Sequence, residues 1–292
     1  MFDMISPQLL FGQLLIGLIN GSFYAMLSMG LAIIFGLMNV VNFAHGVQYM
    51  LGAFCAWLLL NYLGVPYWGA LIIAPLAVGA FGMLMERLVL RPLQHLDHLY
   101  ALLATYAIAL IVEGLVRQEY GSTGLPYAAP ISGGMNLGFM FLPYYRLWVV
   151  VFSIVTCAGT WLLIEYSKLG AYLRAANENP NIVESFGINV PRMITLTYGL
   201  GVGLAALSGV LAAPIYQVSP SMGSGLMITV FAVVVIGGIG SISGAIVTGY
   251  ILGLAEAITK VFYPEAATTV AFVVMIVVLL LKPNGIFSSE KA

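Results

Sequence analysis

The stretch LLFGQLLIGLINGSFYAMLSMGLAIIFGL, residues 9–37, contains no acidic or basic side chain. About 20 apolar residues form a helix long enough to cross roughly 30 Å of hydrocarbon, so this stretch predicts a membrane span. It is too long for the apolar region of a secretory signal, and the residues before it include an acid but no lysine or arginine. Because Asn20-Gly21 interrupts the run, a broken or re-entrant span is the alternative to a single helix.

The remainder of the 292-residue chain has the same character. Hydrophobic residues make up 61% of the sequence and charged residues only 7%, whereas a soluble domain carries about 25% charged residues. Because so few charges cannot cover a surface in water, lipid is the expected solvent. The net charge of −1 gives no indication of a nucleic-acid partner. Cys55 and Cys157 lie inside apolar runs and are interpreted as small buried hydrophobes.

Eight further apolar runs follow the first one, near residues 46–63, 68–86, 99–116, 147–165, 193–213, 226–240, 242–259 and 267–281. The pair 226–240 and 242–259 is short and rich in glycine, so either segment is a candidate re-entrant element. We therefore expect nine spans, within a range of eight to ten. Since the loops are short, residues 1–292 predict a single transmembrane domain, an all-α polytopic helical bundle whose longest inward loop is 166–192.

The positions of lysine and arginine predict the orientation, because these residues are enriched in cytoplasmic loops. If the loop 166–192 is cytoplasmic, alternation of the spans places seven of the ten basic residues inside, namely Arg87, Arg91, Lys168, Arg174, Arg192, Lys282 and Lys291. The three placed outside are Arg117, Arg146 and Lys260. This bias predicts a periplasmic N-terminus and a cytoplasmic C-terminus.

The inward loop contains LGAYLRAANENPNIVESFGINVPR at residues 169–192, which predicts a short helix. Asn179 suits the N-cap position, and Pro180 suits the first helical position, where no amide donor is needed. Gly187 suits the left-handed residue that follows a helix, and Pro191 is expected to stop the chain from continuing. The interval leaves room for about two helical turns.

The predicted short helix has one apolar face, because Ile182, Val183 and Phe186 follow i, i+3 and i+4 spacing. An apolar face on the cytosolic side between two spans needs a cover. Either the headgroup region or another protein is expected to provide it.

Three separated motifs carry a family resemblance: RAANENP at 174–180 followed by GIN at 187–189, INGSFYAMLSMGLAIIFGLMNVVNFAHG at 19–46, and GGIGSISGAIVTG at 237–249. In this order they resemble the permeases of ABC importers, and within them the shorter permease of the branched-chain amino-acid (Liv-type) group. One departure is Glu184-Ser185-Phe186, where the family usually has small residues before Gly-Ile-Asn.

The resemblance implies that the inward loop is the coupling helix, which contacts a cytosolic ATPase. It assigns this contact to Arg174, Ala175, Glu178, Asn179, Pro180, Gly187 and Ile188. The implied partners are two ABC ATPase subunits, a second related permease or a second copy of this chain, and an external solute-binding protein. Without the resemblance, a surface helix that merely joins two spans explains the loop equally well.

The sequence has no phosphate-binding loop of the form G-x-x-x-x-G-K-[ST], since no lysine follows a glycine or precedes serine or threonine. We therefore expect no cofactor bound by this chain and no enzymatic activity of its own, with ATP and magnesium acting in the partner subunits. An intramembrane enzyme is disfavoured, because Ser224 and Ser243 lack the spacing of a nucleophile elbow. No metal site is expected, since His95, Asp97 and His98 are too close in sequence to surround one ion.

Candidate pathway or gate residues are Asn20, Asn39, Asn42 and His45, which lie among apolar neighbours. Irregular backbone at membrane depth persists only where it lines a cavity or is buried in protein. The alternative is a capped turn between two spans whose polar groups satisfy the backbone, with His45 as a structural histidine rather than a proton relay.

Two carboxylates near outer ends of spans are interpreted as local ion pairs, Glu113 with Arg117 and Glu256 with Lys260. A docking surface for an external binding protein is the alternative.

The function predicted from these features is that of a transmembrane permease of an ABC importer in the bacterial inner membrane. The resemblance implies branched-chain or hydrophobic amino acids as solutes. A permease for urea, an amide or a sugar, or an ion-coupled carrier, remains the alternative.

Overall fold

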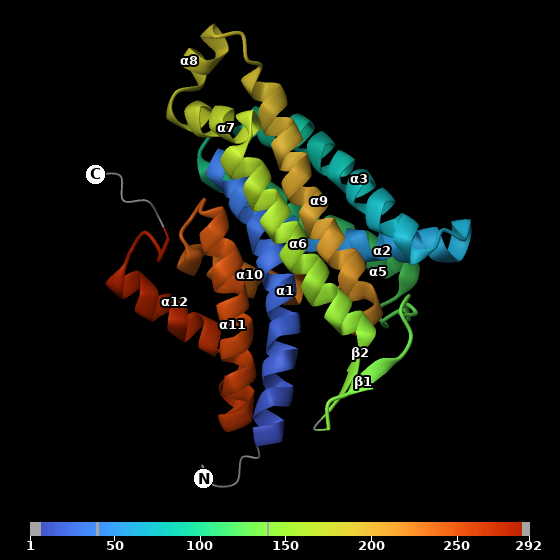
Figure 1. Ribbon diagram of the computed structural model, residues 1–292. Coiled ribbons are helices and arrows are strands. Elements are labelled where there is room, and N and C mark those ends of the chain that lie inside the picture. Colours follow the sequence, from blue (N-terminus) through green and yellow to red (C-terminus); the bar gives the residue numbers. More distant parts are fainter. Residues whose placement is uncertain (1–6, 39–40, 139, 288–292) are drawn as a thin grey trace.

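The computed structural model describes residues 7–38, 41–138 and 140–287, and the fold is almost entirely helical (Figure 1). Within these ranges seven helices are long and apolar enough to cross a membrane. They are α1 (Pro7–Met38), α2 (His45–Leu63), α3 (Tyr67–Met85), α5 (His98–Tyr120), α6 (Tyr144–Tyr166), α9 (Val190–Tyr216) and α11 (Ile242–Phe262). The all-α polytopic bundle is thus confirmed, with seven helices of spanning length in the described ranges instead of eight to ten.

Two predicted spans form shorter apolar helices, α10 (Ser224–Gly237) and α12 (Val270–Leu281). The remaining elements are η2 (Glu86–Leu90), α4 (Arg91–Leu93), β1 (Gly134–Asn136), β2 (Phe141–Pro143), α7 (Lys168–Glu178), α8 (Pro180–Ser185) and η3 (Pro264–Ala266). The two strands pair antiparallel as a small hairpin before α6.

The break expected at Asn20-Gly21 does not occur, because α1 is one continuous helix of 32 residues. Gly21 lies where α11 crosses α1, and a Cβ atom there would lie 3.0 Å from the Cα of Tyr250. The glycine therefore permits close packing rather than a bend. Of the two segments expected to be short, only α10 is short, since α11 has 21 residues.

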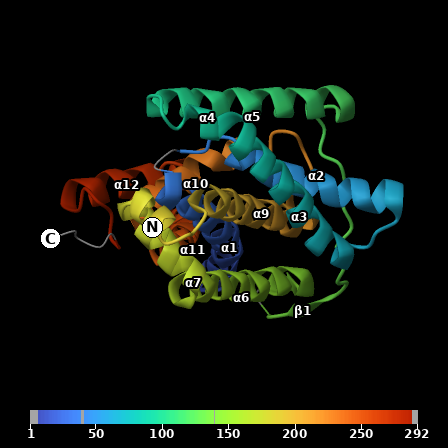
Figure 2. The same ribbon diagram turned by 90° about the horizontal axis from the view of Figure 1, so that it is seen from above.

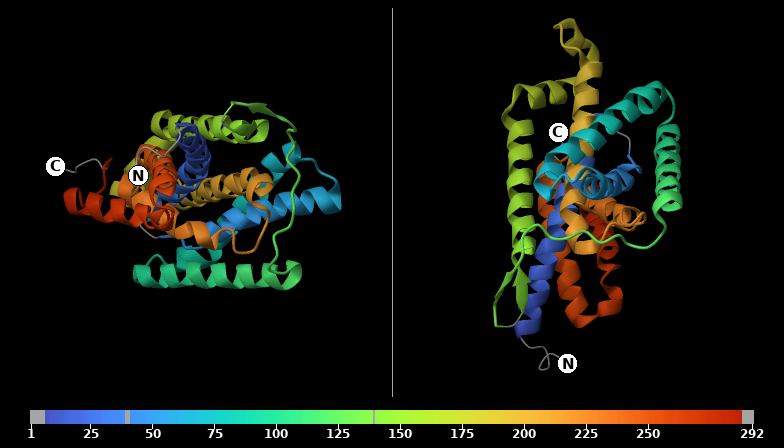
Figure 3. Two further views of the ribbon diagram at one scale, coloured as in Figure 1. Left: turned by 90° about the horizontal axis from the view of Figure 1, so that it is seen from below. Right: turned by 90° about the vertical axis from the view of Figure 1, so that its right-hand side faces the viewer.

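The buried α1 and α9 form the centre of the bundle, and α5 and α6 lie at opposite edges (Figure 2). In α1 83% of the most apolar window is buried, against 17% in α5 and 28% in α6. The first turn of α1 and the α7–α8 loop lie at opposite ends of the molecule (Figure 3). A hydrophobic surface therefore remains on the peripheral helices, as expected of a protein surrounded by lipid or by other membrane subunits.

Glycines permit the close contact between α1 and α11. A Cβ atom on Gly253 would lie 2.5 Å from the Cα of Gly21 and 2.6 Å from the carbonyl oxygen of Gly17. Small residues allow membrane helices to approach in this way, so that dispersion contacts hold them together.

We expect Gly253→Ala to lower the thermal unfolding midpoint of the detergent-solubilised protein, because the added methyl must push α1 and α11 apart. The matched control is Gly114→Ala on exposed α5, where nothing lies within 4 Å of the added Cβ atom. Alanine there improves helix propensity by roughly 0.5–1 kcal/mol. Equal midpoints for the two variants would show that the contact is not tight.

Candidate functional site

The loop between α6 and α9 has the local structure that its sequence predicts. The side chain of Asn179 accepts a hydrogen bond from the amide of Ile182 (3.2 Å) and so caps α8. Pro180 begins that helix, and Gly187 follows it with φ of 81°. The expected role of Pro191 is wrong: it lies in the first turn of α9, where its missing N–H costs nothing.

Helix α8 carries its apolar residues on two sides. Val183 is buried against the protein, whereas Ile182 is 55% and Phe186 80% exposed. The exposed pair is one turn apart and forms an apolar ridge at one end of the molecule, which we call the α8 ridge (Ile182 and Phe186). The prediction of one apolar face is thus wrong for Val183, and the part of that face formed by Ile182 and Phe186 is uncovered in the isolated chain.

The residues assigned to ATPase contact are mostly accessible. Arg174, Ala175, Glu178, Asn179, Pro180 and Gly187 are exposed, and Ile188 is half-buried.

Arg174 contacts its own chain. Its guanidinium donates to the carbonyl oxygens of Ile164 (3.4 Å) and Glu165 (3.2 Å), and it lies 3.5 Å from the Glu165 carboxylate. This arrangement fixes α7 against the end of α6.

A second contact fixes the loop to the central helix. The side-chain amide of Asn177, on α7, donates a hydrogen bond to the carbonyl of Gly36 near the end of α1. The loop is thereby joined to the segment that leads into the predicted gate. Asn177 lies within the motif 174–180, whose sequence predicts no separate role for it.

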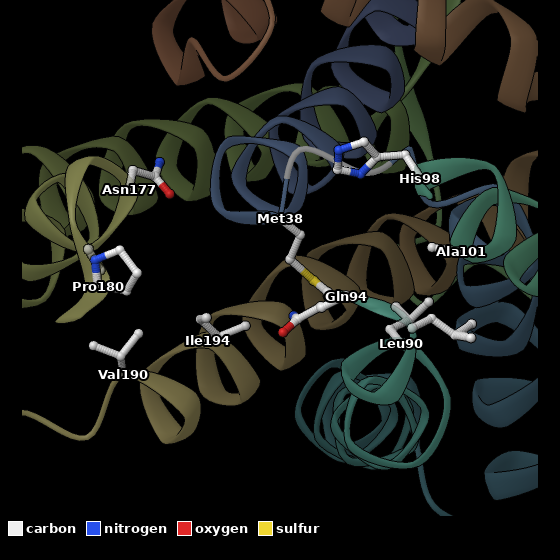
Figure 4. A pocket seen from close by; sticks show the side chains of 11 residues that line it. Met38, Leu90, Gln94, His98, Ala101, Asn177, Pro180, Val190 and Ile194 are labelled. Atoms are coloured by element: carbon white, nitrogen blue, oxygen red, sulfur yellow. The ribbon is translucent and has the colours of Figure 1, made fainter. Parts of the chain in front are cut away.

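A pocket of about 210 Å³ lies beside the loop. Asn177 and Pro180 lie on one side of it and Leu90, His98 and Ala101 on the other, with Met38, Gln94 and Ile194 between them (Figure 4). The pocket thus separates the α7–α8 loop from the turn between α4 and α5. Asp97, just before His98, caps α5 by accepting from the amide of Leu99 (2.9 Å).

An ion pair with a buried carboxylate joins η2 and α4 to the start of α9. The Arg91 guanidinium donates to both carboxylate oxygens of Glu86, at 3.2 and 3.0 Å, and to the carbonyl of Pro191 (3.0 Å). It also donates to the hydroxyl of Thr195, and that hydroxyl donates to Glu86 (2.8 Å). Arg91 served above only to predict orientation, because two of its partners, Pro191 and Thr195, lie about a hundred residues away.

The turn before α2 is buried and hydrogen-bonded. The Asn42 side chain accepts from the amide of Ala44 (3.1 Å) and donates to Gln48 (3.1 Å). His45 donates from Nε2 to the carbonyl of Leu27 (3.0 Å), so α2 begins beside the middle of α1. These hydrogen bonds are those of a capped turn, whereas Nδ1 of His45 is buried without a hydrogen-bond partner among the described residues. Asn39 lies outside the described residues.

Asn20 belongs to a different polar cluster, between α1, α9 and α11. The side-chain oxygen of Asn20 accepts a hydrogen bond from the hydroxyl of Tyr216 (2.6 Å). One turn further along α1, the hydroxyl of Tyr24 donates a hydrogen bond to the carboxylate of Glu256 (2.7 Å). The predicted pair of Glu256 with Lys260 is wrong: Glu256 is buried on α11 and points to Tyr24, while Lys260 is exposed.

The other predicted local pair is confirmed. Arg117 and Glu113 form an ion pair of 2.5 Å along one turn of α5.

Comparison with known proteins agrees with this architecture. The family described as "Branched-chain amino acid transport system / permease component" matches residues 13–279. The chain is 33% identical over 289 residues to the high-affinity branched-chain amino acid transport system permease protein BraD of Pseudomonas aeruginosa, with 94% of each chain covered.

Two further relatives have similar names. The high-affinity branched-chain amino acid transport system permease protein LivH of Escherichia coli is 31% identical over 292 residues, with 94% of each chain covered. A probable branched-chain amino acid transport permease protein LivH of Methanocaldococcus jannaschii is 29% identical over 287 residues, covering 92% of this chain and 90% of the relative. No solved structure matches the chain. With its seven apolar helices, the chain therefore belongs to the branched-chain amino acid transport system permease family and is a multi-pass protein of the bacterial inner membrane.

Proposed function

We propose that this chain is a translocating subunit of an ATP-driven importer for branched-chain and other hydrophobic amino acids. The family match over residues 13–279 carries the proposal. The chain binds no ATP of its own in this account. ATP and magnesium act in two cytosolic ABC ATPase subunits, and an external binding protein delivers the solute.

The α8 ridge is the proposed contact with the ATPase. Exposed Ile182 and Phe186 supply apolar area, and Glu178 and Pro180 lie nearby on the exposed side of the loop. In this proposal Arg174 holds the loop in place through Glu165 rather than contacting the ATPase. A second related permease, or a second copy of this chain, would occupy the other ATPase cleft.

The orientation follows from the same proposal, with the loop 166–192 and the C-terminus in the cytoplasm and the N-terminus in the periplasm. The positions of the first turn of α1 and of the loop at opposite ends of the molecule support it. The excess of basic residues on the loop side supports it as well.

In this proposal, movement of α8 is transmitted to the membrane helices through two sets of contacts. One is the hydrogen bond from Asn177 to the carbonyl of Gly36, at the end of α1. The other is α9, whose first turn is joined to α4 through Arg91. We propose that both sets of contacts reposition the turn containing Asn42 and His45 as an inner gate, with the pocket beside the loop changing its volume.

ATPase activity of the assembled complex tests the coupling part of the proposal. With loaded binding protein, the complex should hydrolyse ATP several-fold faster than without it. Disruption of both Glu178 and Gly187 in this chain should abolish the stimulation but leave the basal rate of the ATPase subunits. Normal stimulation in that double variant would contradict the assignment of the loop.

A further inference from the structure

Two carboxylates are buried in the described part of the chain, and only one of them has a cation. Glu86 is 0% exposed and is neutralised by Arg91. Glu256 is 6% exposed and forms no ion pair with any described residue. Ionisable groups within a bilayer are costly and mark solute or ion pathways more often than packing. Whenever Glu256 is ionised, its negative charge is unmatched among the described residues, and a cation from outside them can compensate it.

The surroundings of Glu256 are suited to a hydrogen-bonding ligand. Tyr24 donates its hydroxyl to one carboxylate oxygen (2.7 Å), which leaves the other oxygen available. Asn20 lies one turn away on the same side of α1 and holds the hydroxyl of Tyr216 (2.6 Å). The edge-to-face contact of Phe23 with Tyr216, at 5.5 Å between ring centroids, fixes that ring beside the cluster.

The cluster is open on one side. Tyr216 is 47% exposed and Asn20 is partly exposed, whereas Tyr24 and Glu256 are buried behind them. Hydroxyl and amide groups on the surface of membrane helices do not suit hydrocarbon, so this side requires water or protein.

A cation also interacts with the exposed tyrosine. Arg146, near the start of α6, interacts electrostatically with Tyr216, and it forms no ion pair with a described residue. Tyr216 also interacts electrostatically with Glu256. One negative and one positive group thus lie near the same hydroxyl. An α-amino acid carries the complementary pair, an ammonium and a carboxylate on adjacent atoms.

We propose that Glu256 binds the ammonium group of an α-amino acid during its passage. Tyr24 and Tyr216 position the carboxylate of Glu256, and Arg146 faces the carboxylate of the solute. This inference rests on the proposed transport of amino acids and specifies the group that recognises them within the membrane. Charge complementarity of this kind provides specificity, since a solute without the ammonium leaves Glu256 buried and unpaired.

The test is leucine uptake into proteoliposomes that contain the complete complex, with ATP inside and loaded binding protein outside. Glu256→Gln keeps the shape of the side chain and removes its charge. We expect at least a tenfold fall in uptake, with an unchanged thermal midpoint and with ATPase stimulation by the loaded binding protein retained within about twofold. Tyr24→Phe should lower uptake about threefold. The matched control is Glu113→Gln on α5, which should transport normally.

The outcomes separate this inference from the proposed function. No uptake by the wild-type complex would contradict the proposed function itself. Normal uptake by both the wild-type complex and Glu256→Gln would overturn the inference alone. If Glu256→Gln fails to assemble, uptake by Tyr24→Phe and by Arg146→Gln tests the inference instead. Uptake at the wild-type rate by both of these variants would overturn it. Parallel loss of uptake and thermal midpoint in these variants would also overturn it, in favour of a structural role.

Discussion

Replacement of Phe186 by aspartate is expected to abolish ATP-driven transport, because it removes the larger half of the α8 ridge. Phe186 is 80% exposed in the isolated chain, so the substitution removes no internal contact that stabilises the fold. Burial of a phenylalanine side chain in a partner stabilises by about 1.5–3 kcal/mol. Each 1.4 kcal/mol is about a factor of ten, so the affinity for the ATPase should fall roughly 10- to 100-fold.

Co-purification of the ATPase subunits with the permease measures this loss. Burial of the new carboxylate in an apolar cleft costs free energy in addition to the lost apolar contact area. A loss of affinity near 100-fold is therefore expected. The control is Phe141→Asp, which places the same change on exposed β2, in the hairpin far from α8. ATPase retention by Phe186→Asp equal to that of the control would show that another surface makes the contact.

Replacement of Arg91 by methionine is expected to destabilise the folded protein by about 3–5 kcal/mol, because it leaves a buried carboxylate without its cation. Glu86 is 0% exposed, and Arg91 supplies two hydrogen bonds to it as well as the contact with Pro191 at the start of α9. The free energy of unfolding in mixed micelles or bicelles measures the loss. The same variant should weaken the connection of η2 and α4 to α9 and so lower the coupling of ATP hydrolysis to uptake.

Two further variants separate the buried charge from the lost side chain. The double variant Glu86→Gln with Arg91→Met removes the uncompensated charge and should recover most of the lost stability. Arg117→Met breaks an ion pair whose arginine is 53% exposed, and exposed pairs contribute only about 0–1 kcal/mol. A loss for Arg91→Met no larger than that for Arg117→Met would refute the buried-pair account.

Local signals predicted local structure well. Asn179, Pro180 and Gly187 fix the ends of α8 through groups within a few residues of one another, so the sequence alone was sufficient to place that helix. The pair Glu113–Arg117 was predictable for the same reason. Such reasoning failed for Glu256, which has a lysine at the same spacing but is buried against a tyrosine 232 residues earlier in the chain.

Long-range packing decided what the sequence could not. Asn20-Gly21 has the composition of a helix break, yet the close approach of α11 and the hydroxyl of Tyr216 make it part of a continuous helix. The ion pair of Glu86 with Arg91 is local, but its connection to Thr195 spans 109 residues. Polar residues that are spaced without periodicity acquire partners only when the helices are assembled. No pattern in the sequence therefore predicts these partners.

The central claim is that this chain moves amino acids only as part of an ATP-driven complex. Its most direct test is leucine uptake into proteoliposomes, measured with this chain alone under an imposed proton or sodium gradient and with the complete complex supplied with ATP and binding protein. The account predicts uptake by the complete complex that disappears when ATP is replaced by a non-hydrolysable analogue, and no uptake by the chain alone. Gradient-driven uptake by the chain alone would contradict it.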